Sequence, residues 1–276
     1  MLGQGETEGV FQLESSGMKQ VLVGLQPQNL EDVIALISLY RPGPMDSIPT
    51  YLRNRHEPDK ISYKTPQLAH ILDVTNGCIV YQEQVMQIFR ELAGFSFGQA
   101  DNVRRAMSKK KHAVMEAERE HFVHGCTEPG HECPGCVANG ISEEVANEIY
   151  DEMSSFASYA FNKSHAACYA YVAFQTAYLK CHYPSEFMAA LLTSVLDNTD
   201  KVIEYSGECA RLGIKVLPPD VNISNGGFTA DNGKIRFGLN AVKNVGRNLI
   251  ERVVEERKEK PYSSSMISVR GCTALS

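Results

Sequence analysis

Apolar residues recur at helical spacing through most of the chain, which predicts a mainly α-helical fold. Residues 28–39 form one such run, with Asn29 as its expected cap. It stops at the Arg-Pro-Gly-Pro segment of residues 41–44, because proline cannot continue a helix. Residues 83–93 place their apolar side chains on one face, and Gly94 is the expected terminator of that helix.

Four more helices are expected over residues 142–156, 164–181, 187–196 and 204–212. The first two begin with a serine that can accept a hydrogen bond from the first turn. The helix over 164–181 contains neither glycine nor proline and is apolar nearly all round. A helix with that composition is expected to be central and buried.

The pattern changes beyond residue 213. Two short runs with strand character, residues 227–230 and 234–238, flank Asn232-Gly233, which favours a tight β-hairpin. A charged helix is expected over 249–258. Residues 213–262 are therefore predicted to form a small α+β subdomain beside the helical part.

A dense cationic segment follows Asp101, which can cap a helix and would place Arg104 and Arg105 in its first turn. Cations there oppose the helix dipole, so an anionic ligand would reverse the penalty. Lys109, Lys110 and Lys111 extend the segment. A solvated basic face remains the simpler alternative.

The start of the helix over 164–181 carries a second cationic group. Lys163, Ser164 and His165 lie where unpaired backbone N–H groups attract phosphate, and Ser164 is the expected cap. Tyr159 lies just before them. On their own, His165 would more often make a local hydrogen bond, and Tyr159 would more often be a core residue. The coincidence of both with cations favours a phosphate or nucleic-acid site.

Composition narrows the class of protein. The 276 residues carry a formal net charge of −6, which argues weakly against nucleic-acid binding, although the charges are segregated along the chain. No apolar run reaches the roughly 20 residues that span a bilayer, and no signal-peptide pattern begins the chain. We therefore expect a soluble, cytoplasmic protein whose eight cysteines are mostly buried thiols.

Several catalytic signatures are missing. The chain has no phosphate-binding Gly-rich loop ending in Lys-Ser or Lys-Thr, no Gly-x-Ser-x-Gly and no Asp-x-Asp pair for a metal clamp. Phosphate-binding groups without metal-binding carboxylates indicate the substrate-binding part of a larger catalyst.

One cluster has the spacing of zinc ligands, in a loop over residues 121–140. Its members are Cys126, His131, Cys133 and Cys136, which could hold tetrahedral Zn²⁺. The alternative is a Gly/Pro-rich surface loop in which cysteines happen to cluster.

Motifs spread over most of the chain, two of which contain the arginine pair and the Lys163-Ser164-His165 group, resemble the alpha subunit of bacterial DNA polymerase III, a replicative C-family polymerase. The matching motifs are GVFQLES at 9–15, LYRPGPM at 39–45, VYQEQVM at 80–86, RRAM at 104–107, FNKSHAA at 161–167 and YPSEFMAA at 183–190. The resemblance implies a fingers domain over 28–212, preceded by a palm-edge segment over 1–27. It further implies that the catalytic aspartates that hold Mg²⁺ lie outside this chain, so that the fragment alone is inactive.

The resemblance also implies roles for individual residues. Arg104 and Arg105 would contact the incoming triphosphate, while Tyr159 and His165 would line the nascent base-pair pocket beside Lys163. The lysines at 109–111 would at most touch DNA backbone. The implied partners are template-primer DNA, dNTP, a sliding clamp and other replisome subunits. A non-catalytic nucleic-acid-binding module and a zinc-stabilised module remain alternatives.

The last residues, 263–276, lose the family pattern. Ser265 to Thr273 can be encoded by bases that, read together with the preceding T, spell Phe-Tyr-Asp-Phe-Cys-Glu-Arg-Met-Tyr. That peptide resembles the continuation of the family, so we expect this tail to be frameshifted.

Overall fold

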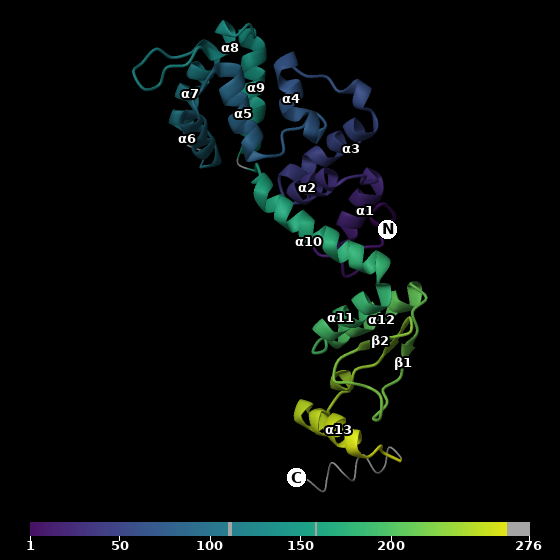
Figure 1. Cartoon of the computed structure of the whole chain (residues 1–276). Helices are drawn as coiled ribbons and strands as arrows, with labels where there is room; N and C mark the ends of the chain where they lie inside the picture. The colour runs from purple at the N-terminus through teal and green to yellow at the C-terminus, as the bar shows by residue number, and fades with distance from the viewer. Residues whose placement is uncertain (110–111, 158, 264–276) are drawn as a thin grey trace. The chain divides into compact units, whose positions relative to one another are not determined.

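The computed structural model describes residues 1–109, 112–157 and 159–263, and the chain divides into two compact units (Figure 1). The first unit contains residues 2–5 and 15–172, and the second contains residues 1, 6–14 and 173 onward. In the described part of the chain, no helix is both long and apolar enough to cross a membrane.

The first unit is helical. Its α-helices are α1 (Ser16–Leu25), α2 (Leu30–Leu39), α3 (Ile48–His56), α4 (Ala69–Leu72), α5 (Gln82–Ala93), α6 (Phe97–Ser108), α7 (His112–His124), α8 (Gly135–Ala138), α9 (Glu143–Ala157) and the start of α10 (Lys163–His182). Short 3₁₀ turns occur at Leu2–Gln4, Pro44–Ser47, Pro58–Lys60, Pro66–Leu68 and Asp73–Thr75.

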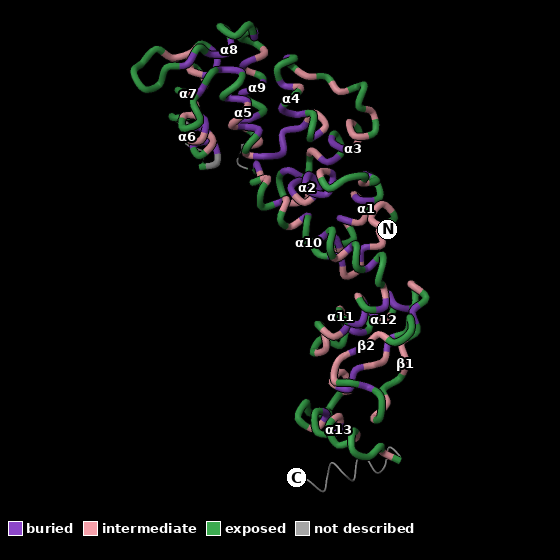
Figure 2. Tube along the Cα trace, viewed as in Figure 1, coloured by how far each residue is buried: buried purple, intermediate pink, exposed green. Residues whose placement is uncertain are grey.

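The core of the first unit lies among α5, α6, α7 and α9, whose inward faces are buried in Figure 2. Phe89 of α5 is at its centre, because its ring centroid lies 5.0 Å from that of Phe122 and 6.0 Å from that of Tyr150. Both contacts are edge-on, an arrangement that aromatic rings favour. This aromatic cluster fixes α5, which in turn carries residues of the candidate site.

The second unit combines helices with a small sheet. Its elements are the end of α10, α11 (Pro184–Ser194), α12 (Thr199–Arg211), β1 (Val216–Leu217), β2 (Thr229–Asp231), β3 (Lys234–Arg236), a 3₁₀ turn (Leu239–Ala241) and α13 (Arg247–Glu259). The strand order is β1-β3-β2, with β1 parallel and β2 antiparallel to β3.

The predicted hairpin is confirmed. Asn232 and Gly233 join β2 to β3 with φ of 49° and 74°, the positive values that a tight hairpin turn requires. The buried Ile235 pairs with Ala230 on one side and Val216 on the other. The fold class, mainly α with a smaller part that mixes helix and strand, is as the sequence predicts.

Several helix ends are also as predicted. Asn29 caps α2 by accepting the N–H of Asp32 at 2.9 Å, and Ser142 accepts the N–H of Val145 at 3.3 Å at the start of α9. Gly94 ends α5 with a φ of 75°, in the left-handed region where glycine carries no steric penalty.

The expectation that the long helix is central and buried is wrong. The buried stripe of α10 consists of the small residues Ala166, Ala170, Ala173 and Ala177, followed by Lys180. Large side chains lie on its exposed surface, where 56% of Tyr171 is accessible. The helix is apolar on both sides, but it packs through alanines because they allow close approach, and its aromatic residues remain outside.

The predicted functional boundaries at residues 27 and 212 stay predictions. The division between the compact units falls within α10, and it does not test which segment serves as palm edge or fingers. The predicted frameshifted tail falls almost entirely on residues 264–276, which lie outside the described residues.

Candidate nucleotide-binding site

The predicted start of the basic helix is wrong. The cap of α6 is Ser96 and not Asp101: the side chain of Ser96 accepts the N–H of Gln99 at 3.3 Å, and the N–H of Ser96 donates to Gln99 Oε1 at 2.7 Å. The helix therefore begins at Phe97, and the arginine pair lies near its C-terminal end. Cations there favour the helix dipole and carry no electrostatic penalty.

Asp101 instead holds both arginines. Its Oδ1 accepts bonds from Arg104 Nε at 3.1 Å and Nη2 at 2.7 Å, while its Oδ2 lies 2.7 Å from Arg105 Nη2. The hydrogen bonds from Arg104, and then those from Arg105, hold the pKa of this carboxyl below its usual value. The two guanidinium groups are thus oriented by one carboxylate.

Gln82, at the start of α5, connects this helix to the loop before α10. Its Oε1 accepts a 3.0 Å bond from Arg104 Nη1, and its Nε2 donates a 3.0 Å bond to the carbonyl of Ala160. The backbone adds to the connection, since Phe161 donates to Val80 O and Gln82 donates to Phe161 O. The structure therefore brings Arg104 and the loop around residue 160 together, as the sequence alone could not show.

The first turn of α10 already binds an anion. Both oxygens of Glu83 accept the backbone N–H of Lys163, at 3.2 and 3.1 Å, and one accepts Asn162 Nδ2 at 3.1 Å. The cap is Asn162, whose Oδ1 accepts the N–H of His165 at 2.9 Å, and the prediction that Ser164 caps this helix is wrong. A phosphate ligand would meet Lys163 through its side chain, since a carboxylate holds its backbone N–H.

The side chains at this helix start are only partly engaged. Lys163 Nζ lies 3.0 Å from Glu31 Oε2, with 34% of the lysine side chain exposed. The ring of His165 lies 5.4 Å from that of Phe161 and 4.4 Å from that of Tyr169, measured between centroids. The start of α10 therefore offers a ligand one partly exposed cation, Lys163, and a row of three rings, Phe161, His165 and Tyr169.

Tyr159 is seated by the Arg-Pro-Gly-Pro segment. Its ring lies against Gly43, where an added Cβ would approach to 2.4 Å, and Gly43 has a φ of 101°. Arg41 donates to the carbonyl of Tyr159, and its guanidinium lies 4.3 Å from the ring centroid of Phe161. Burial lowers the pKa of Arg41. Only glycine at position 43 leaves room for the Tyr159 ring in this position.

Sequence reasoning missed Arg41, Gln82 and Glu83 as parts of the site. They lie in two of the motifs that carry the family resemblance, but the residue of the 159–163 segment that each contacts is about 80 or more positions away. Only a known contact between those segments could have identified them.

The basic segment is described in part. Lys109 is exposed and lines, with Asn102, Arg105, Ala106 and Val114, a cavity of about 280 Å³. The other two lysines of the predicted backbone contact, Lys110 and Lys111, lie outside the described residues.

The four predicted zinc ligands do not fit a metal centre. Cys126 and Cys133 pair through backbone hydrogen bonds of 2.9 Å, while Cys136 is fully buried in the core, where burial raises the pKa of its thiol to about 12. Across the described ranges, no three His, Cys, Asp or Glu side chains are grouped to hold a metal ion.

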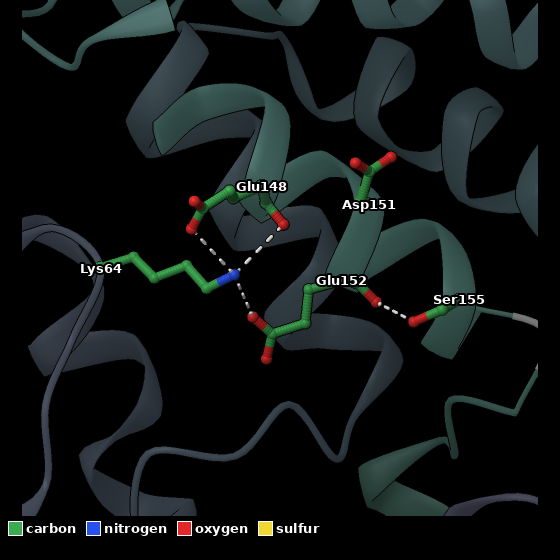
Figure 3. Close-up of a pocket in the computed structure, with 5 residues that line it drawn as sticks. All are labelled: Lys64, Glu148, Asp151, Glu152 and Ser155. Atoms are coloured by element: carbon green, nitrogen blue, oxygen red, sulfur yellow. Dashed lines mark hydrogen bonds and ion pairs between the residues drawn. The ribbon is translucent and has the colours of Figure 1, made fainter. Parts of the chain in front are cut away.

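Another hollow, of about 470 Å³, lies beside α9. Figure 3 shows Lys64 between the carboxylates of Glu148 and Glu152, with Asp151 nearby. Three carboxylates and one ammonium give this surface a negative charge, so it is unsuited to phosphate.

The second unit exposes a loop before α13. Residues 243–248 are exposed throughout and include Lys243 and Arg247. The residue before the helix is Gly246, which has no side chain to cap the first turn, although its carbonyl accepts the N–H of Leu249 at 3.0 Å. This loop combines cations with a helix N-terminus, as anion-binding surfaces do.

Comparison with known proteins gives a consistent result. The family described as the bacterial DNA polymerase III alpha subunit finger domain matches residues 1–130, and a helix-hairpin-helix motif matches residues 213–272. The sequence pattern over 213–262 predicts an α+β subdomain but does not reveal this motif.

Curated relatives match nearly the whole chain. DNA polymerase III subunit alpha of Thermus aquaticus is 51% identical over 270 residues, which cover 96% of this chain and 21% of that protein. The same subunit of Bacillus subtilis is 47% identical over 95% of this chain and 23% of its own length, and that of Escherichia coli K12 is 45% identical over 95% and 22%. The chain thus spans about a fifth of the length of these relatives. It belongs to the bacterial DNA polymerase III alpha subunit family and includes the finger domain of that family.

Proposed function

We propose that this chain is the part of a DNA-directed DNA polymerase that binds the incoming dNTP and the template-primer DNA. The observation that carries the proposal is the bridge through Gln82, which ties Arg104 of α6 to the loop that begins α10. Cations and aromatic side chains that lie apart in the sequence thereby belong to one site.

The nucleotide-binding residues of the proposal are Arg104, Arg105, Tyr159, Lys163 and His165. Phosphoryl transfer depends on positioning and on cations that neutralise developing charge. A triphosphate can compete with the carboxylates that now pair with these cations, since it carries more charge and more acceptor oxygens than one carboxylate. Tyr159 and His165 offer rings to a base pair.

The chemistry itself needs a metal. The relatives are polymerases, and Mg²⁺ supplies charge neutralisation at the transferred phosphate in such enzymes. Among the described residues no group of three or more His, Cys, Asp or Glu side chains could hold a metal ion, so we propose that its ligands lie elsewhere in the full-length protein. The isolated chain should therefore bind nucleotide without extending a primer. A sliding clamp and other replisome subunits are the proposed partners of that protein.

A DNA-binding role for the second unit has its own support. The helix-hairpin-helix match includes the exposed residues 243–248, where Lys243 lies in the loop and Arg247, which pairs with Asp197, begins α13. Phosphate contacts of this kind are independent of sequence and weaken with salt. We propose that this loop contacts the DNA backbone.

The test is calorimetric titration of the chain with dNTP. The variant Arg104→Ala/Arg105→Ala should lose binding. A matched control, Lys60→Ala/Lys201→Ala, removes two cations that also pair with an acid on their own element, and it should bind as the wild type does. If both double variants lose dNTP affinity equally, the loss reflects net charge alone. If the chain binds DNA in a salt-sensitive way but binds no dNTP, the alternative of a non-catalytic nucleic-acid-binding module is favoured.

A further inference from the structure

Arg104 and Arg105 are adjacent in the chain, but α6 presents them to different surroundings. Successive residues of a helix point about 100° apart, which follows from 3.6 residues per turn. The side chain of Arg104 is 18% exposed and that of Arg105 is 64% exposed. The resemblance treats them as one phosphate-binding pair, whereas their environments differ.

The guanidinium of Arg104 donates its hydrogen bonds to other residues of the protein. Nε and Nη2 point at Asp101, and Nη1 points at Gln82, whose amide continues to the carbonyl of Ala160. A planar guanidinium can serve two partners in fixed directions at once, and a lysine ammonium on its flexible stem cannot reproduce that geometry. The contact therefore depends on shape as well as charge.

Arg105 faces open space. It pairs with Asp101 Oδ2 and lines the cavity of about 280 Å³ that Asn102 and Lys109 also border. Asn102, Arg105 and Lys109 follow one another at intervals of three and four residues, so they share one face at the end of α6. An entering phosphate would meet an amide, a guanidinium and an ammonium there.

We propose that the two arginines have separate tasks: Arg105 binds phosphate, and Arg104 is a positioning residue that acts through Gln82 to hold the 159–165 loop against α6. The proposal rests on the proposed nucleotide-binding function. It assigns phosphate affinity to one face of α6, and the placement of Tyr159 and His165 to the other.

Two probes separate these tasks in the full chain: a dNTP, which has a base and a sugar, and inorganic tripolyphosphate, which has neither. Gln82→Met changes no charge and breaks the bridge. It should lower dNTP affinity about fivefold, the size of one neutral hydrogen bond, and leave tripolyphosphate affinity unchanged. Arg105→Gln should lower both affinities about tenfold, as expected for a lost charge-assisted bond.

Lysine replacements give a second criterion. Arg105→Lys should keep most of the affinity for both probes because it keeps a cation beside the cavity. Arg104→Lys should lose dNTP affinity as Gln82→Met does. The proposal is overturned if Gln82→Met binds dNTP like the wild type, or if Arg104→Lys retains full dNTP affinity.

A third readout does not depend on nucleotide. The Nη1 protons of Arg104, which donate to Gln82 Oε1, should exchange slowly with solvent in an NMR experiment, and quickly in Gln82→Met, whereas those of Arg105 should exchange quickly in both proteins. Equal exchange of the two arginines in the wild type would refute the division of tasks. If the wild type binds neither probe, the proposed function fails for the isolated chain, and the exchange rates still decide the role of Arg104.

Discussion

The carboxylate of Glu83 accepts the backbone N–H of Lys163 with both oxygens, at 3.1 and 3.2 Å, although the two residues are 80 positions apart. A side chain of α5 thus serves as the anion at the N-terminus of α10. The negative charge that favours a helix N-terminus is thus supplied by a residue of the same chain.

Glu83→Ala should therefore destabilise the first unit. The loss of a helix-terminal acceptor and its charge is worth about 1 kcal/mol of unfolding free energy, measured by urea denaturation. Glu144→Ala removes an acid from the first turn of α9 and serves as the control. A variant of Glu83 no less stable than this control would show that the bond contributes nothing.

Asp101→Asn should increase triphosphate affinity. Asp101 competes with phosphate for Arg105, and removal of one partly exposed carboxylate is worth about 0.2–1 kcal/mol, or roughly a 1.4-fold to fivefold gain. Titrations at low and high salt would check this, because screening should shrink the difference. Asp200→Asn, on the exposed start of α12, should show no gain.

A buried ion pair in the second unit should dominate its stability. Lys180 Nζ donates to Glu208 Oε1 at 2.6 Å and to the carbonyls of Glu6 and Glu8. The side chains of Lys180 and Glu208 are 0% and 3% exposed. Lys180→Met leaves Glu208 without this partner, so the loss should be about 3–5 kcal/mol. Differential scanning calorimetry should show a correspondingly lower Tm, and an unchanged Tm would contradict the structure.

The same pair makes stability depend on pH. Burial alone would raise the pKa of Glu208, but the hydrogen bonds from Arg211 and Lys180 outweigh it and hold the pKa below its ordinary value. A depressed carboxyl pKa gives stability that is present above the unfolded pKa, about 4.3, and is lost as the pH falls through the folded one. Between pH 6 and pH 3, the free energy of unfolding should therefore fall more steeply with decreasing pH in the wild type than in Glu208→Gln.

Thiol chemistry should follow burial. Cys168 and Cys181 are exposed and should react first with a thiol reagent in the native protein, whereas the buried Cys136, with a pKa of about 12, should react only on unfolding. Chelator should leave the Tm unchanged, since Cys126, His131, Cys133 and Cys136 form no metal-binding group. Stoichiometric zinc in the purified protein would contradict this.

Sequence reasoning worked best where a helix end has one available cap. Asn29 and Gly94 have no close rival and were placed correctly. It failed where two candidates lie within a few residues, because the choice between Ser96 and Asp101 depends on which side chain reaches a first-turn N–H. At α10 the polar group that caps the helix, Asn162, precedes the predicted serine by two residues.

The site was predictable in its cations but not in their partners. Arg104, Arg105 and Lys163 stand out as charges near helix ends and within family motifs. Glu31 and Gln82, which engage Lys163 and Arg104, lie 132 and 22 residues from them, and no local pattern encodes those distances. The burial of α10 was predicted wrongly for a similar reason: apolar residues on all sides of a helix do not reveal which side packs.

The most direct test of the nucleotide site is to map it by NMR chemical shifts while dNTP is added to the chain. The account predicts shifts at Arg105, Lys163 and His165 that saturate together, with Lys64 and Glu152 of the acidic hollow unaffected. Shifts confined to residues 243–248, or spread with no saturation, would contradict a nucleotide site on α6 and α10.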